Sequence, residues 1–442
     1  MPQETIYEHL KKYRDQGLSS FHTPGHKCSG FFPQDLLSLD LTALPDTDAL
    51  YEANGIILDT EKQLARLFGA ERTLISAGGC TLAIQTMLRI ASKRGGKILF
   101  ARSLHRSAVN TAALLGIVPV WICPHSDNGF FTGRVTPEDI ELALKNDSGI
   151  TACYITSPDY YGEISDIAGI AEVCHRHGVL LLVDNAHGSH LRFMKKDRHP
   201  ITLGADMSAC SLHKTLPVLT GGSVLNIADS ELAEGAKEDM ALFGSTSPSY
   251  PIMASIGLCL EYLTNGGIEE YRRLEDRIGS IRELAAENGL VVPGGECDPL
   301  RVCFNTSCAG LEGEAQTDYF HSFGIEPEFC DGKTAVFICT PFNKEEDFIR
   351  LENSIKNLRG SGIAVPPVNT VLPEAVFTPR EALMRPCESV PVDKAEGRIC
   401  GEIACPCPPG IPVVMPGEII NKDVIAAVRA SYPEGTGIKC VK

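Results

Sequence analysis

The chain contains no long hydrophobic run: none of its apolar stretches approaches the roughly 20 residues that a membrane span requires. Residues 1–6, MPQETI, lack the basic and apolar regions of a signal peptide. Internal repeats and low-complexity segments are also missing. These absences argue against a membrane protein and predict a cytoplasmic location.

Positive charge is in short supply, with 40 Lys and Arg against 56 Asp and Glu and a net charge of −16. Such a surface repels nucleic-acid phosphates, so we exclude a nucleic-acid partner. It is compatible with a cationic amine substrate, although acidic surfaces commonly serve solubility.

The 17 cysteines form no paired C-x-x-C array, and their odd number and scatter through apolar segments argue against a disulfide framework. Cys405 and Cys407 are the only close pair, and we expect no metal site there. The pattern predicts reduced, buried thiols in a cytosolic protein.

The length of 442 residues is sufficient for two domains with sizeable cores. Short apolar runs alternate with helical patterns at 137–145 and 166–177, which is typical of a mostly parallel sheet with helices on both faces. The seven runs span 72–76, 97–101, 118–122, 151–156, 179–183, 206–211 and 222–227. We therefore predict an α/β fold built on a seven-stranded sheet.

A long helical region is predicted from Pro248 to about residue 289, and a second unit follows it. That unit has strand-like runs at 300–305 and 335–339 on either side of a helical pattern at 312–323. We predict an N-terminal arm (1–50), a major domain (51–290) and a smaller α+β C-terminal domain (291–442), with a linker near 360–368.

Lys214 lies directly after a strand-like run and before turn residues, in the stretch SACSLHKTLPVLTGG (208–222). A desolvated lysine loses its proton more readily, and the free amine can form a Schiff base with an aldehyde. The alternative is an ordinary loop lysine with its amine in water.

Asp184 follows the apolar run VLLLV (179–183), which places a carboxylate at the C-terminal end of a buried parallel strand. Ligands bind at that end of open α/β sheets, where a carboxylate can hold a proton on a heterocyclic nitrogen such as that of a pyridoxal ring. The alternative role is a helix N-cap.

Two further strand ends carry candidate ligand contacts. The stretch TLISAGGCT (73–81) runs through two glycines into an amphipathic segment, and such a turn at a helix start can cradle a phosphate. His105 follows the strand-like run 97–101, and it can stack on a planar cofactor or cap the next helix.

Four candidate elements follow one another along the chain: the phosphate turn, the stacking histidine, the strand-end aspartate and the Ser-x-His-Lys motif. With them the sequence resembles the bacterial ornithine/lysine/arginine decarboxylase family, pyridoxal-phosphate enzymes of the aspartate-aminotransferase fold (fold type I). The motifs that carry the resemblance are FHTPGHK (21–27), TSPDYYG (156–162), DNAHGSH (184–190), SLHKTLP (211–217), STSPSY (245–250), GRI (397–399), PCPPGIP (406–412) and PGE (416–418).

The resemblance implies a role for each matched residue. Lys214 carries pyridoxal 5'-phosphate as a Schiff base, Asp184 pairs with the pyridine nitrogen, and His105 stacks on the ring. Beside the ring lie Ala186 and His187. The phosphate is expected to be held by Ser211, His213, Gly79, Cys80, Thr81 and, from a neighbouring subunit, Thr246. His213, like Lys214, is a candidate proton donor, and the fold implies at least a homodimer with shared sites.

The sequence also departs from the family pattern near this site. The phosphate turn usually reads Asn-Gly-Ser-Thr, whereas residues 77–80 read Ala-Gly-Gly-Cys, so two hydroxyl contacts are lost or pass to Thr81. Asn185 and Ser189 replace the usual Glu and Ala of the strand-end motif. We therefore expect substrate preference to differ from that of better-known members.

A cationic substrate side chain needs an acidic or aromatic partner. The acidic candidates are Asp46, Asp48, Glu388 and Glu418, and Glu388 is favoured over the first two because it lies in the matched C-terminal region. Arg398 can meet a carboxylate or a phosphate, or form a structural ion pair. His26 belongs to a Pro-Gly turn motif that can reach the active site of a partner subunit.

The sequence thus predicts decarboxylation of lysine, arginine or ornithine to the corresponding polyamine-pathway amine. Two alternatives stay open: another pyridoxal-phosphate reaction, such as transamination or β-elimination, and a catalytically silent regulator. The presence of both Lys214 and Asp184 argues against the second. The length predicts a compact member, without an extra N-terminal receiver-like domain.

Overall fold

The computed structural model describes residues 15–27, 29–33, 35–44, 46–125, 133–363, 372–405, 412–431 and 436–442. Most of the PCPPGIP motif, the second half of the expected linker and the first part of the expected arm lie outside these ranges. Among the helices of the described ranges, none is both long enough and apolar enough to cross a bilayer.

Seven strands form the central sheet, in the order β2-β8-β7-β6-β5-β3-β4. They are β2 (Arg72–Ser76), β3 (Lys97–Ala101), β4 (Val118–Ile122), β5 (Ile150–Thr156), β6 (Leu180–Asp184), β7 (Met207–Cys210) and β8 (Ser223–Ile227). Only β8 runs antiparallel to its neighbours. The predicted seven-stranded, mostly parallel sheet is confirmed, and every strand end lies within one residue of its predicted place.

Strand direction gathers the predicted site at one edge of the sheet. Both β2 and β7 run antiparallel to β8, so they run parallel to each other. The carboxyl ends of β2, β3, β5, β6 and β7 therefore share one edge, and this is the edge at which α/β sheets bind ligands.

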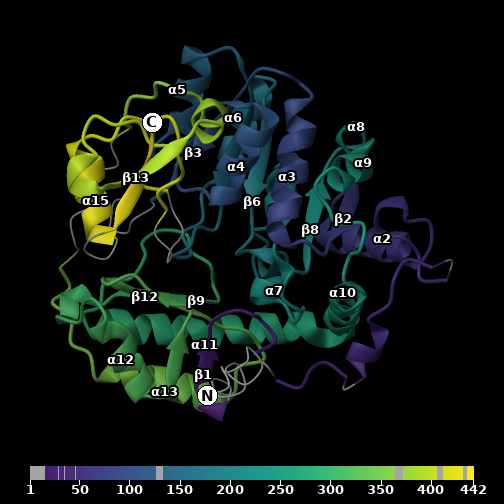
Figure 1. Cartoon of the computed structure of the whole chain (residues 1–442). Coiled ribbons are helices and arrows are strands. Elements are labelled where there is room, and N and C mark those ends of the chain that lie inside the picture. The colour runs from purple at the N-terminus through teal and green to yellow at the C-terminus, as the bar shows by residue number, and fades with distance from the viewer. Residues whose placement is uncertain are drawn as a thin grey trace, which may run out of the picture.

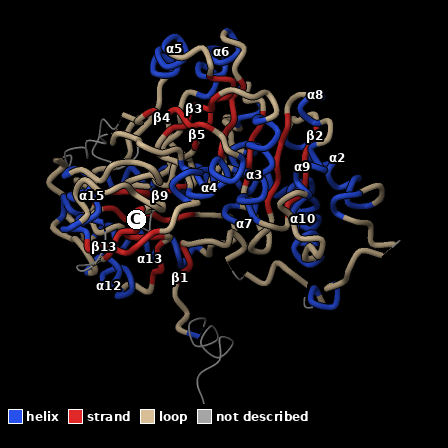
Figure 2. Tube along the Cα trace, turned by 45° about the horizontal axis from the view of Figure 1, so that its top comes forward, coloured by secondary structure: helices blue, strands red, loops and turns tan. Residues whose placement is uncertain are grey.

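Helices cover both faces of the sheet (Figures 1 and 2). They are α3 (Gly79–Ser92) and α4 (Arg106–Leu115) on one face and α5 (Pro137–Asn146) and α6 (Ile167–Arg176) on the other. Strand side chains alternate between the two cores: Ile98 and Phe100 pack with α3 and α4, whereas Leu99 packs with α5 and α6.

A second, three-stranded sheet lies beside a long helix (Figure 1). Its strands, in the order β11-β12-β9, are β11 (Phe329–Cys330), β12 (Thr334–Ile338) and β9 (Arg301–Asn305). The helices are α11 (Ile268–Glu287), α12 (Ala315–Ser322) and α13 (Glu345–Lys356). The helical region predicted from Pro248 is α10 (Tyr250–Tyr262) plus α11, and these join across a break where Gly266 has φ +111°.

The C-terminal residues form a separate small body with its own core. Strands β13 (Cys387–Pro391) and β14 (Gly437–Val441) pair antiparallel beside α15 (Lys422–Ser431). A short helix, α14 (Pro379–Leu383), lies against α4 of the central sheet, where Arg380 donates to the carbonyl of Leu114 at 2.7 Å. A smaller C-terminal domain is therefore confirmed, while the boundary at 290 and 291 stays a prediction.

Candidate active site

Lys214 lies in a single helical turn, α7 (Leu212–Thr215), directly after β7. The turn lies between the central sheet and α11 (Figure 1), where the Tyr271 hydroxyl donates to the carbonyl of Thr215 at 2.8 Å. Lys214 Nζ is 2.8 Å from His187 Nε2. Burial lowers the pKa of Lys214, which favours the free amine that Schiff-base chemistry requires.

Asp184, at the end of β6, is only 1 % exposed. It accepts hydrogen bonds from the Tyr154 hydroxyl at 3.0 Å and from the Ala186 N–H at 3.1 Å. Within the described ranges it forms no ion pair. A buried carboxylate is costly without a cationic partner, so Asp184 fits a protonated ring nitrogen of a ligand.

The glycine turn opens α3 as predicted. Gly79 has φ +70° and donates its N–H to the Gly221 carbonyl at 2.8 Å, and a Cβ there would meet nothing within 4 Å. The N–H groups of Cys80 and Thr81 follow in the first helical turn, where no intrahelical acceptor exists. This open helix start fits a phosphate. Burial, with Asp184 nearby, raises the pKa of Cys80 well above its usual value, so the thiol stays neutral.

Ser211 and His213 meet the same glycine turn from the other side. Ser211 Oγ lies 3.2 Å from His213 Nδ1, and that nitrogen is 3.1 Å from the Gly222 carbonyl. Because Gly79 bonds to Gly221, the two predicted phosphate-binding segments converge around Gly221 and Gly222.

His105 caps α4: its Nδ1 accepts from the Ser107 N–H at 3.2 Å. Capping uses a lone pair in the plane of the ring, so it does not conflict with stacking. Burial lowers the pKa of His105, and Asp184 and Lys214 both act on its charge, which places His105 within the same group of side chains.

The N-terminal FHTPGHK segment packs against the Lys214 turn of its own chain. The Gly25 N–H donates to the His213 carbonyl at 2.7 Å, and a Cβ on Gly25 would lie 2.6 Å from the Leu216 carbonyl oxygen. His26 is half-buried, and its charge acts on His213. The structure therefore brings His26 to the site within one chain, whereas the sequence suggested a reach into a partner subunit.

Sequence reasoning missed Arg301, at the start of β9. This side chain is 2 % exposed, donates to the Tyr160 carbonyl at 2.8 Å, and places its NH2 group 3.3 Å from His187 Nδ1. The one sequence signal for Arg301 is its position as an arginine at the start of an apolar run. No neighbouring residue in the sequence indicates that it lies near Lys214.

Several predicted substrate and cofactor residues lie elsewhere. Glu388 and Arg398 form an exposed ion pair of 2.8 Å on the C-terminal body. Thr246 is exposed in the loop before α10. Within the described ranges no hydrogen bond joins these three to Lys214 or Asp184, and their roles stay predictions.

The two other acidic candidates with described contacts have structural partners. Glu418 is buried against Arg102, at 2.5 and 3.0 Å. Asp48 accepts backbone N–H groups at the start of α2 (Ile56–Phe68), among them Gly55 and Ile57 at 3.0 Å.

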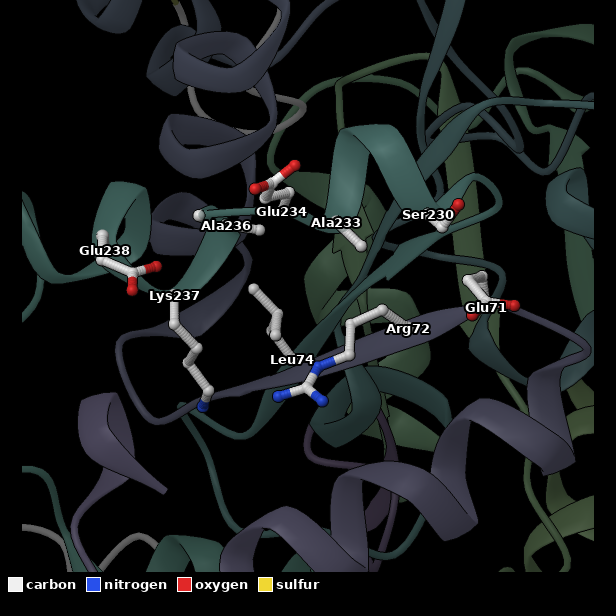
Figure 3. A pocket seen from close by; sticks show the side chains of 10 residues that line it. Glu71, Arg72, Leu74, Ser230, Ala233, Glu234, Ala236, Lys237 and Glu238 are labelled. Atoms are coloured by element: carbon white, nitrogen blue, oxygen red, sulfur yellow. The ribbon is translucent and has the colours of Figure 1, made fainter. Parts of the chain in front are cut away.

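A cavity of about 460 Å³ at the edge strand β2 is not this site (Figure 3). The charged ends of Arg72 and Lys237 approach each other from two sides of it, and both side chains pair with the buried Glu61. Because neither Lys214 nor Asp184 lines it, the cavity has no part in the proposed chemistry.

The fold is that of the fold type I pyridoxal-phosphate enzymes, and the sheet-edge lysine, the buried aspartate and the open helix start fit such a cofactor. The family description "Orn/Lys/Arg decarboxylase, major domain" matches residues 4–289, and the corresponding C-terminal domain matches residues 366–431. The chain belongs to the Orn/Lys/Arg decarboxylase family.

Curated relatives and solved structures agree with this assignment. An arginine decarboxylase of Bacillus subtilis is 29% identical, over 98% of this chain and 94% of its own. The constitutive lysine decarboxylase of Escherichia coli is 22% identical, over 94% of this chain and 75% of its own. The structure of lysine decarboxylase A from Pseudomonas aeruginosa superposes with a TM-score of 0.78 at 18% identity, over 99% of this chain and 80% of that chain.

Proposed function

We propose that this protein is a pyridoxal-phosphate-dependent decarboxylase that converts lysine, arginine or ornithine to the corresponding amine and CO₂. The observation that carries the proposal is that two buried groups lie at the same edge of the sheet. One is Lys214, whose pKa is lowered, and the other is Asp184, which has no ion-pair partner within the described ranges. The relatives named as arginine and lysine decarboxylases support the reaction and the class of substrate.

Lys214, Asp184, His105, Ser211, His213 and the Gly79 turn would hold the cofactor. When bound, pyridoxal phosphate supplies an electron sink for the bond that breaks at the substrate Cα. Asp184 would keep a proton on the ring nitrogen, and the helix start would hold the phosphate. Lys214 and His213 are the candidates that would return a proton to the substrate Cα.

The charges around Lys214 suit a cationic amino acid. Asp184 and Glu328 both act on the Lys214 amine, and the chain as a whole carries a net charge of −16. Negative potential at a cleft raises the local concentration of a cationic substrate.

The deciding assay measures CO₂ and amine release from lysine, arginine and ornithine by the purified protein with added pyridoxal phosphate. Release that is lost in Lys214→Ala establishes the reaction and names the substrate. A keto acid together with pyridoxamine phosphate indicates a transaminase instead. If Lys214 binds the cofactor but no CO₂ or keto acid is released, decarboxylation of these three substrates is ruled out.

The protein is further proposed to be a cytoplasmic homodimer that supplies polyamine biosynthesis. Thr246 is exposed in the single chain, as expected for a residue that completes the site of a neighbouring subunit. Mixing Lys214→Ala with Thr246→Ala restores activity in one site of a mixed dimer if Thr246 acts across the interface, and restores none if it acts within its own chain.

A further inference from the structure

His187 is held between two basic side chains, Lys214 and Arg301. Its Nε2 is 2.8 Å from Lys214 Nζ and its Nδ1 is 3.3 Å from Arg301 NH2. Arg301 in turn contacts Asp298 at 3.4 Å, and Asp298 is 2.7 Å from His190 Nε2. Five side chains from the central sheet and the three-stranded sheet thus form one continuous polar chain in the interior.

The chemistry of arginine determines the proton position on His187. A guanidinium only donates and does not lose its proton in proteins, so its contact with Nδ1 requires a lone pair on Nδ1. A second proton on the ring would lie on Nδ1, where it would oppose the donating guanidinium of Arg301. The neutral ring has one N–H, which must therefore be on Nε2.

The same reasoning extends to Lys214. Nε2–H points at Nζ across 2.8 Å, and two donors cannot share a hydrogen bond. Nζ must accept, and an amine accepts only in its uncharged form.

We propose that Arg301, held by Asp298, is a positioning residue that fixes the single proton of His187 on Nε2, so that the ring donates to Lys214 Nζ and keeps it as a free amine. The inference deepens the proposed function, because it names residues that prepare the same lysine for its aldehyde partner.

Three further observations fit this arrangement. Arg301 is fixed by the Tyr160 carbonyl at 2.8 Å, and the Tyr160 ring lies 5.0 Å from the His187 ring, so neither partner turns freely. Burial lowers the pKa of His187 well below its usual value, with Lys214, Arg301, His105 and His213 acting in the same direction. Burial also lowers the pKa of Lys214, and Arg301 acts in the same direction, against the opposing charges of Asp184 and Glu328.

The direct test reads the proton position by nitrogen NMR of the imidazole rings in cofactor-free protein labelled with ¹⁵N-histidine. The signals of His187 are those that disappear in His187→Gln. In the wild type we expect an unprotonated Nδ1 and a protonated Nε2, and in Arg301→Met we expect the proton to redistribute to Nδ1. Protonation on Nδ1 in the wild type, or an unchanged ring in Arg301→Met, overturns the proposal.

Arg134→Met is the matched control. Arg134 also joins separate segments, through the Glu296 carbonyl at 2.9 Å, and among the described residues its hydrogen bonds and ion pair do not involve His187. It should leave the His187 signals as in the wild type. Asp298→Asn is a second variant in case Arg301→Met does not fold, because it weakens the hold on Arg301 and keeps a polar group beside His190.

An independent experiment measures the rate at which cofactor-free protein binds the pyridoxal phosphate aldehyde, as a function of pH. In this step the Lys214 nitrogen forms a double bond to the aldehyde carbon, and the carbonyl oxygen leaves as water with the two amine protons, without any change of oxidation state. In Arg301→Met the midpoint should move to higher pH, and capture at neutral pH should slow about tenfold for each unit of the shift. A midpoint that does not move contradicts the proposal.

Both measurements are made without an amino-acid substrate. Their results therefore do not depend on which product the enzyme releases, and they remain valid if the decarboxylase proposal fails.

Discussion

Asp184 and Asp298 are both buried, yet they are compensated in different ways. Burial alone would raise the pKa of Asp298, but His190 and Arg301 lower it to about 2. Within the part of the chain that the structure describes, the Asp184 carboxylate accepts only from a tyrosine hydroxyl and a backbone N–H. Asp298 is thus paired within the protein, and Asp184 is the carboxylate left for a ligand.

Asp184→Asn should lower kcat by about 10- to 100-fold, because an amide cannot stabilise a positively charged ring nitrogen as a carboxylate does. The measurement is amine release with cofactor content determined in parallel. Asp206→Asn is the control, since Asp206 precedes β7 at the other edge of the sheet and bonds to Leu181 N–H. Equal losses in both variants would show that Asp184 has no special role.

His199 predicts a pH dependence of stability. Burial lowers its pKa from 6.5 to about 3, and its ring lies 5.1 Å from Phe68. Between pH 6.5 and 3 His199 is protonated in the unfolded chain but stays neutral in the native protein. The free energy of unfolding therefore falls by up to about 1.4 kcal/mol for each pH unit of acidification in this window.

His199→Phe should remove that share of the pH dependence. Urea unfolding of both proteins at pH 8, 6.5 and 5.5 tests this. The difference at pH 8 reports packing and the loss of the 3.4 Å contact between His199 Nε2 and Cys210 Sγ, because the histidine is then neutral in both states. Parallel pH curves for the two proteins would contradict the assignment.

At the scale of elements, the strands of the central sheet were predictable and several connections were not. Buried parallel strands appear as short continuous apolar runs, and each run had clear polar boundaries. The break between α10 and α11 was missed although Asn265, Gly266 and Gly267 carry a turn signal. The pairing of β13 with β14 joins segments far apart in the chain, and no local pattern reports such a contact.

The candidate site divides in the same way. Lys214, Asp184, His105 and Gly79 each follow or end a strand, so strand order alone predicts that they meet. Arg301 comes from another sheet, and its contact with His187 depends on how the two sheets pack. Tyr154 lies within the apolar run 151–156, and nothing in that run reports its hydrogen bond to Asp184, which lies on the neighbouring strand.

Gly25→Ala tests the contact between the N-terminal segment and α7. An added Cβ would lie 2.6 Å from the Leu216 carbonyl oxygen, so one of the two backbones must move. We expect a loss of about 1–3 kcal/mol in the free energy of unfolding, together with a lower kcat/KM. Both are measured on the same preparations, by urea unfolding and by amine release.

Gly279→Ala is the control for that experiment. Gly279 lies within α11, and a Cβ there meets nothing within 4 Å. Alanine should stabilise the helix by about 0.5–1 kcal/mol without altering kcat/KM. A Gly25 variant that behaves like the Gly279 variant would show that the N-terminal contact is not tight.

At the scale of the whole molecule, one buried ion pair connects the central sheet to the C-terminal body. Arg102 follows β3, and Glu418 lies in the C-terminal segment, where it also accepts from the Met415 N–H at 2.8 Å. Both side chains are buried, and the guanidinium bonds both carboxylate oxygens. Loss of one partner leaves the other charge without compensation.

Glu418→Gln should therefore lower the free energy of unfolding by about 3–5 kcal/mol. Glu388→Gln, in the exposed pair with Arg398, should leave the unfolding midpoint close to that of the wild type, because water screens that pair. Urea unfolding of the two variants compares the same residue types in two environments. Similar midpoints would show that the buried pair does not hold the two bodies together.

The N-terminal segment has a consequence for the order in which the protein can mature during synthesis. Strand β1 (Ser19–Phe21) pairs with β10 (Ile325–Pro327), and the Gly25 carbonyl accepts from Thr340 Oγ1 at 2.8 Å. These residues precede their partners by some 300 positions in the chain, so the partners are made much later. The turn that carries Lys214 thus acquires its last contacts only when most of the chain has left the ribosome, so truncated nascent chains should be unable to retain the cofactor.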